Sequence, residues 1–347
     1  MVTQRTTLCV ALGTMVAVAL TGCVKRKETI KVADDGGVTA RIEYEADSLS
    51  ELTEGDALPS HQAGWSVDRK TQVDDDGDET HIFLAEKVFP PGMELPGCYA
   101  GPDDPDVELY LRFPTTLTIE QRADGTYYHF HRSYPLRRHW AHLEAISAEL
   151  IGEIDESLPD PDDTQWNMDH WSYAVERLVR IEVAKMTAFA RSALRDADPD
   201  APQDAWLRIR AALQTMEKDT DCARLAHMLT GARDDEEQSQ ALIAEAQAIE
   251  AEAMNRMTSA LAEVLGDNRR LAVEFADAYQ WHKRYHEISE DLADEAFEII
   301  VQMPGEIVAA NTDKLDGNQA TWEFSGEDLR DRNFDDLDLM VTSHVAK

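Results

Sequence analysis

Six histidines lie in two short stretches of the chain at spacings that suit metal coordination. In the first stretch His129 and His131 are two residues apart, so a strand would place both imidazoles on one face. His139 and His142 follow at a helical spacing of three. Imidazole nitrogens are common Zn²⁺ ligands. Three arginines lie among these histidines and would repel a cation, so the alternative is a set of solvated or hydrogen-bonded rings.

The second stretch places His282, His286 and Glu290 at positions i, i+4 and i+8, which share one face of a helix. His286 and Glu287 begin like the zinc-protease motif, but position 290 is Glu where that motif has its second His. His282 also continues an apolar stripe, which favours a core or boundary histidine. Both stretches are therefore metal candidates that support one functional alternative, a metal-dependent or carboxylate hydrolase.

Runs of aspartate could contact Ca²⁺ loosely, but none has the ligand spacing of an EF-hand. The run at 74–78 would need a Glu six residues after Gly77, and Phe83 stands there. We interpret this run as a hairpin tip, and those at 103–106 and 160–163 as loops. No nucleophile elbow, phosphate-binding loop or dinucleotide glycine pattern occurs. The sequence therefore predicts a non-enzymatic protein with no catalytic residue.

The N-terminus has the character of a secretory leader. Arg5 gives it one positive charge, and the stretch 6–20 that follows is uncharged. This stretch is shorter than the roughly 20 residues of a membrane span. It ends in Leu20-Thr21-Gly22-Cys23, an order of branched apolar, small, Gly and Cys that resembles the lipobox of bacterial lipoproteins. The resemblance covers residues 1–23 and implies cleavage between Gly22 and Cys23 and acylation of the Cys23 thiol.

Several acyl chains on Cys23 would anchor the protein stably, whereas a single chain binds only marginally. The cations of Val24-Lys25-Arg26-Lys27 then either touch anionic headgroups or begin a solvated strand. Strand-like sequence begins near Thr29, so we expect residues 23–28 to form a short lipidated tether. By the same resemblance, Val24 in place of Asp favours the outer membrane in an organism with two membranes. The expected location is extracytoplasmic and lipid-anchored, with the covalent lipid as the sole cofactor.

The remaining cysteines and the overall charge limit the function further. Cys9 leaves with the leader, so Cys98 and Cys222 either form a disulfide in an oxidising envelope or remain small buried hydrophobes. The chain of 347 residues carries a formal net charge of −35. Such acidity argues against nucleic-acid binding, which draws most of its affinity from basic patches. The membrane is the expected partner, and a protein partner is not identified by the residues.

The pattern of apolar residues predicts an α+β fold. Residues 29–136 contain three pairs of alternating runs joined by Asp- and Gly-rich turns, as antiparallel hairpins do. Residues 137–287 change to helical periodicity and predict a bundle of four or five helices. Residues 288–347 return to strands. We therefore expect an antiparallel β-rich domain, built from both ends of the chain, with the helical bundle as an insertion.

Residues 303–329 carry a second resemblance. Pro304-Gly305 after a strand, an Asn, the Gly317-Asn318 turn and a strand with Trp322 resemble the closing segment of the LppM-type domain of bacterial surface lipoproteins. The hairpin at 29–47 fits the same domain. The resemblance implies a small α+β domain on an envelope protein, with no catalytic residues. This chain departs from that pattern in its helical block and in having no C-terminal membrane helix.

Together these features predict an extracytoplasmic lipoprotein with a non-enzymatic binding or structural role. Two alternatives remain open at this level. One is the hydrolase that would use the histidine stretches, and the other is a carrier that holds an apolar ligand between sheet and helices.

Overall fold

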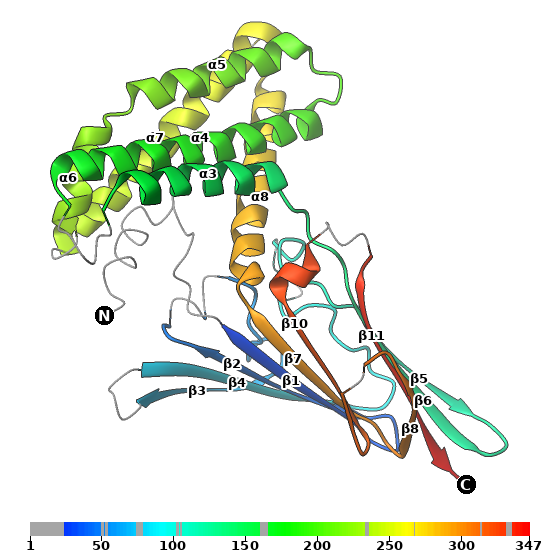
Figure 1. Cartoon of the computed structure of the whole chain (residues 1–347). Coiled ribbons are helices and arrows are strands. Elements are labelled where there is room, and N and C mark those ends of the chain that lie inside the picture. The colour runs from blue at the N-terminus through cyan, green and yellow to red at the C-terminus, as the bar shows by residue number, and fades with distance from the viewer. Residues whose placement is uncertain are drawn as a thin grey trace. The chain divides into compact units, whose positions relative to one another are not determined.

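A computed structural model describes residues 24–49, 52, 55–73, 79–101, 104, 106–159, 166–232, 236–266, 268–312, 314–330 and 335–347. The chain divides into two compact units (Figure 1). The helical unit is Trp140–His286, and the β-rich unit joins the described residues up to His139 with Glu287–Lys347. Along the chain, strands come first, then a block of helices, then strands again. This order confirms the predicted α+β class.

Seven strands form sheet A, in the order β3-β4-β2-β1-β7-β10-β9. Their bounds are β1 Lys25–Val32, β2 Val38–Ala46, β3 Ser66–Val73, β4 Glu79–Phe89, β7 Ala296–Gln302, β9 Lys314–Asp316 and β10 Gln319–Ser325. The β1–β2 turn has the Asp-Gly chemistry that the sequence predicts, because Gly36 takes a φ of 86° and the Gly37 amide donates to Asp35 Oδ1 over 2.9 Å.

Four strands form sheet B, in the order β5-β6-β11-β8. They are β5 Thr115–Gln121, β6 Gly125–Tyr134, β8 Glu306–Ala310 and β11 Leu337–Ala346. All three pairings in this sheet are antiparallel. Side chains alternate along β6, where Tyr128, Phe130, Arg132 and Tyr134 are buried and the residues between them are not. This alternation gives sheet B one inner and one outer face.

One strand pair departs from the antiparallel expectation. β1 and β7 run parallel, with Ile30 opposite Val301 and Glu28 opposite Ile299. Parallel neighbours need a long crossover connection, whereas hairpin partners need only a short turn. The whole chain between β1 and β7, including the helical unit, supplies that crossover. The insertion therefore joins two central strands of one sheet.

The first strand also begins earlier than predicted. β1 starts at Lys25, so the expected tether of residues 23–28 is wrong from Lys25 onward. The sequence analysis placed Arg26 either at the lipid headgroups or in a solvated strand, and charged side chains are seldom buried. In the structure Arg26 and Glu28 are both about 1% exposed and alternate in phase with Ile30 and Val32. Their burial is possible because partners from elsewhere in the chain neutralise them.

The described part of the helical unit contains α3 Ala141–Ser157, α4 Met168–Ala197, α5 Gln203–Asp219, α6 Cys222–Ala232, α7 Glu236–Leu265 and α8 Arg269–Ala293. These six helices exceed the predicted four or five, because the short α6 has too few turns to show a clear stripe. The apolar residues that recur at helical spacing form the core of this unit; Val175, Leu213 and Met257, for example, are fully buried. α8 ends inside the β-rich unit, which begins again at Glu287. None of the described helices has the length and apolar character of a membrane span.

Gly326 permits a close backbone approach inside the β-rich unit. A Cβ at this position would overlap the carbonyl oxygen of Leu292 at the end of α8. We expect Gly326→Ala to destabilise the β-rich unit by about 1–3 kcal/mol, the usual cost of overpacking. Urea denaturation measures the change. Gly97→Ala is the control, because its Cβ would meet Pro114 at an ordinary 3.7 Å; equal effects of both substitutions would contradict the steric argument.

Candidate functional site: a buried ionic cluster

The first histidine stretch does not gather into one site. His129 and His131 share a face of β6, as predicted, and each has its own partner on β11. His129 Nδ1 lies 3.1 Å from Thr342 Oγ1, and His131 Nε2 lies 2.9 Å from Asp338 Oδ1. His139 accepts from Arg330 Nη1 over 2.9 Å in the β-rich unit, whereas His142 is on α3 in the helical unit.

The second stretch lies on α8 and is also divided. His282 Nε2 lies 2.7 Å from Asp196 Oδ2, and its side chain is buried. The His286 ring contacts Trp140 and Phe189, with ring centroids 5.2 Å from each. Glu290 belongs to the other unit, where it pairs with Arg330 over 3.3 Å. Within the part of the chain that is described, no three His, Cys, Asp or Glu side chains are grouped to hold a metal ion.

The remaining candidate residues are the cysteines and the aspartate runs. Cys98 and Cys222 lie in different units, and both are free thiols in the structure, each partly buried. Burial raises the pKa of both thiols. Because the two residues belong to different units, the disulfide between them stays a prediction of the sequence. Gly22, Cys23 and the runs at 74–78 and 160–163 lie outside the described residues, as do residues 103 and 105.

The strongest concentration of buried charge is one that the sequence analysis did not predict. We name it the ionic cluster, and it consists of Arg26, Glu28, Asp56, Arg132 and Glu295, all at most 8% exposed. Its members come from β1, from the segment after β2, from β6 and from the junction between α8 and β7. Two guanidiniums and three carboxyl groups therefore meet inside the β-rich unit.

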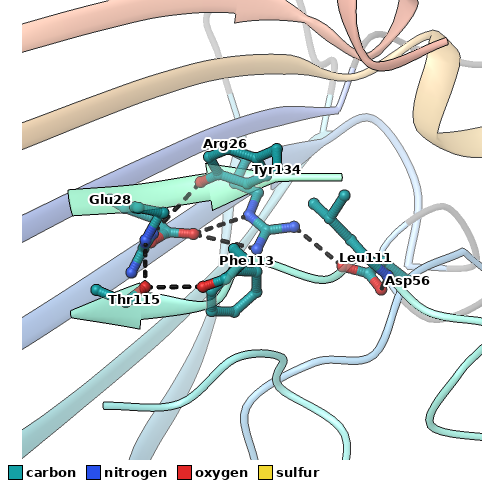
Figure 2. A network of polar contacts seen from close by, with 8 residues as sticks. Arg26, Glu28, Asp56, Leu111, Phe113, Thr115 and Tyr134 are labelled. Atoms are coloured by element: carbon teal, nitrogen blue, oxygen red, sulfur yellow. Dashed lines mark hydrogen bonds and ion pairs between the residues drawn. The ribbon is translucent and has the colours of Figure 1, made fainter. Parts of the chain in front are cut away.

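Glu28 is the centre of the ionic cluster, because its carboxylate binds both arginines. Figure 2 labels Glu28 and Arg26. Oε1 accepts from Arg26 Nε over 3.1 Å, and Oε2 accepts from Arg132 Nη1 over 2.6 Å. Arg132 Nε also donates to Thr115 Oγ1, which donates to the Phe113 carbonyl. Burial alone would raise the pKa of Glu28, but Arg132 and Arg26 together hold it below its usual value. Glu28 is on sheet A and Arg132 on sheet B, so this ion pair joins the two sheets.

Arg26 is enclosed by aromatic rings as well as by acids. Its guanidinium carbon lies 5.1 Å from the Tyr99 ring centroid, 5.2 Å from Tyr44 and 5.3 Å from Phe297. A cation over aromatic faces gains up to about 2 kcal/mol when both are desolvated. These rings replace part of the hydration that Arg26 loses on burial. The arginine therefore stays charged in the core.

Asp56 connects the ionic cluster to two other segments. Its Oδ2 accepts from Arg26 Nη1 over 3.0 Å, and its Oδ1 accepts from the backbone amide of Leu111 over 2.9 Å (Figure 2). One carboxylate thus holds the segment after β2 against both β1 and the segment before β5. Because both oxygens are used, Asp56 is a satisfied buried anion.

Glu295 is the member without a counterion of its own. Its Oε2 is buried and has no hydrogen-bond partner among the described residues. Burial raises the pKa of Glu295 to about 8, and Asp56 and Asp291 add to the increase while Arg26 opposes it. Glu28 and Asp56 already neutralise the two arginines, so a third negative charge would be in excess. Glu295 therefore keeps its proton at neutral pH.

Comparisons with known proteins add little to this geometry. No protein-family model matches the chain, and no curated protein matches it either. A solved structure that does match is the folded domain of LppM from Mycobacterium tuberculosis, determined by NMR. The match covers 95% of each chain at 8% identity, with a TM-score of 0.28. A likeness of that size establishes neither a shared fold nor a shared function.

The geometry of the ionic cluster indicates a structural role. The ion pairs of the cluster are enclosed. Two hollows of about 290 and 520 Å³ are lined by residues of the helical unit, and both are bordered by Glu252 and Arg256. Because Glu28 must face Arg132, a one-residue slip of β1 would turn it outward and leave a buried arginine unpaired. The signal for this was present in the sequence, since Arg26 and Glu28 continue the apolar alternation of Ile30 and Val32.

Proposed function

We propose that this protein is an extracytoplasmic lipoprotein, anchored through acyl chains on Cys23, with a non-enzymatic binding or structural role in the cell envelope. The observation that carries the proposal is Leu20-Thr21-Gly22-Cys23 at the end of an uncharged leader. A thiol in that position is the acceptor of diacylglycerol in lipoproteins, and cleavage before it frees an amine for a further acyl chain. Two or more chains give stable attachment, which one chain does not.

The start of the fold supports the same proposal. β1 begins at Lys25, two residues after Cys23, so a lipid on Cys23 would hold the β-rich unit directly at the membrane surface. A chain of net charge −35 gains no attachment to anionic lipids from its overall charge, so a covalent anchor supplies the membrane affinity. In an organism with two membranes, Val24 favours delivery to the outer one.

Replacement of Cys23 by Ser tests the anchor. In cells that process lipoproteins, we expect the wild-type chain to incorporate labelled palmitate and to sediment with membranes. Cys23→Ser is expected to lose the label and to leave the membrane fraction, because a hydroxyl cannot form the thioether. Cys98→Ser, which changes a free thiol in the fold, is the control and retains both properties. Mass spectrometry of a wild-type product with an unmodified residue 23 would refute the proposal.

A further inference from the structure

The outward side chains of three central strands form a surface whose charge differs from that of the whole chain. We name it the central outer face; it comprises the outward side of β2, β1 and β7, the neighbouring strands of sheet A. Alternation along these strands turns Arg26, Glu28 and most apolar side chains inward, and the residues between them outward. Its charged members are Lys25, Lys27, Lys31, Arg41, Glu43, Glu45 and Glu298.

The central outer face has a small excess of positive charge, whereas the chain as a whole is strongly negative. The chain as a whole has 68 acidic residues against 33 lysines and arginines. On the central outer face the cations outnumber the carboxylates. Lys25 and Lys31 are exposed. Arg41 stays 58% exposed although it pairs with Glu43 over 3.5 Å, and Lys27 stays 47% exposed although it pairs with Glu298 over 2.7 Å. These ammonium and guanidinium groups can still reach an external anion.

The anions nearest to these cations would be lipid headgroups, because β1 begins next to the proposed anchor. Cys23 lies two residues before Lys25, so the two Cα atoms are at most about 7 Å apart. At that distance charges near the headgroups are only partly screened, since the Debye length is about 8 Å at physiological salt. Lys31, in contrast, is six residues along β1 from Lys25 and about 20 Å away at the usual strand rise. It reaches the headgroups only if β1 lies along the membrane.

We propose that β1 lies along the bilayer, so that the central outer face of sheet A contacts anionic lipid headgroups. The inference rests on the proposed function, because the anchor on Cys23 brings this face to the surface. An acidic body beside an anionic membrane is repelled over most of its surface. Turning the face that bears Lys25, Lys27, Lys31 and Arg41 toward the headgroups replaces that repulsion with attraction. The partner is the lipid surface itself.

Photo-crosslinking of the lipidated full-length chain in vesicles tests this orientation. A benzophenone amino acid replaces Thr39, which is opposite Lys31 on the central outer face, or Thr118, an exposed threonine on β5 of sheet B. In vesicles that contain phosphatidylglycerol we expect about fivefold more lipid adduct at Thr39 than at Thr118, a factor equivalent to one cation at the surface. The excess should vanish in 1 M salt, where the Debye length is about 3 Å.

Charge reversal supplies the matched comparison. The triple change Lys25→Glu, Lys27→Glu and Lys31→Glu should abolish the excess at Thr39. The control triple Arg195→Glu, Lys218→Glu and Arg270→Glu makes the same change in net charge at exposed positions of the helical unit and should preserve it. All six residues are exposed, so folding should be retained, and circular dichroism verifies this.

The outcomes separate the two proposals. Intact mass is measured on the same samples, and an unmodified Cys23 would overturn the proposed function. A lipidated chain with equal adducts at Thr39 and Thr118 would overturn this orientation and leave the anchor intact. An excess that persists in 1 M salt, or in purely zwitterionic vesicles, would overturn the electrostatic explanation.

Discussion

Glu28→Gln is expected to destabilise the β-rich unit by about 3–5 kcal/mol, the usual cost of breaking a buried ion pair. The substitution keeps the shape of the side chain but removes the negative charge that both Arg26 and Arg132 contact. Asp56 would still pair with Arg26, but Arg132 would lose the carboxylate that neutralises it. Uncompensated charge in the core, not a lost contact area, is the source of the large effect.

The measurement must distinguish the two units, because they need not unfold together. Hydrogen–deuterium exchange in low urea, followed on peptides from β1 and β6, reports unfolding of the β-rich unit alone. The matched control is Glu298→Gln, a carboxylate on the exposed side of the same sheet that pairs with Lys27. Exposed pairs contribute about 0–1 kcal/mol. A loss for Glu28→Gln no greater than that of the control would show that the cluster is not stabilised as described.

The pH dependence of the Glu28→Gln effect has a definite sign. The pKa of Glu28 is lower in the folded chain than its ordinary 4.5, because Arg132 and Arg26 outweigh the effect of burial. A carboxyl whose pKa is lower in the folded than in the unfolded chain stabilises the fold at pH values above its unfolded pKa. That stabilisation is lost as the pH falls through the pKa of the folded state. The difference between wild type and Glu28→Gln should therefore be full at pH 6 and shrink below about pH 4.5.

Glu295→Gln is expected to act in the opposite direction and stabilise the protein. Its carboxyl has a pKa of about 8 when folded and an ordinary value of 4.5. Between those values the unfolded chain carries the charge and the folded chain must bind a proton, so folding is penalised by about 1.4 kcal/mol for each pH unit. At pH 7 the penalty is about 3 kcal/mol. Glutamine is a neutral isostere and does not incur it.

This gain should depend on pH in a way that identifies its origin. At pH 4.5 wild type and Glu295→Gln should differ little, because the carboxyl is protonated in the folded chain and still half protonated in the unfolded one. The difference should grow up to about pH 8 and stay constant above it, where both states are ionised. Glu298→Gln, three residues further on, is the control and should show no such trend. Equal stabilities of wild type and Glu295→Gln at pH 8 would mean that Glu295 ionises normally.

Local patterns in the chain predicted much of the architecture correctly. The Asp- and Gly-rich turns separated the strands, since two-residue alternation and turn chemistry are properties of neighbouring residues. The helical periodicity of residues 137–287 predicted helices for the same reason, and the 30-residue α7 is one of them. The predicted insertion of helices between two strand segments needed only the order in which strand alternation and helical periodicity follow one another along the chain. Each of these features depends on contacts within one element or one hairpin.

The histidine clusters show where spacing along the chain is insufficient. His129 and His131 share a strand face, as alternation requires, but their neighbours are Thr342 and Asp338 from a strand more than 200 positions away. His282 pairs with Asp196 on another helix. A metal site needs ligands that converge in space, and spacing within one element says nothing about which other element lies opposite.

Local patterns along the chain were enough to predict the fold class, the succession of strands and helices, and the candidate lipid anchor at Cys23. The burial of Arg26 and Glu28 and the start of β1 at Lys25 followed from the folded arrangement alone, because a charge can be buried only where a counterion meets it. Glu28 can be buried because Arg132, 104 positions along the chain, meets it from the other sheet. Glu295 keeps its proton because it is buried and its Oε2 has no hydrogen-bond partner among the described residues.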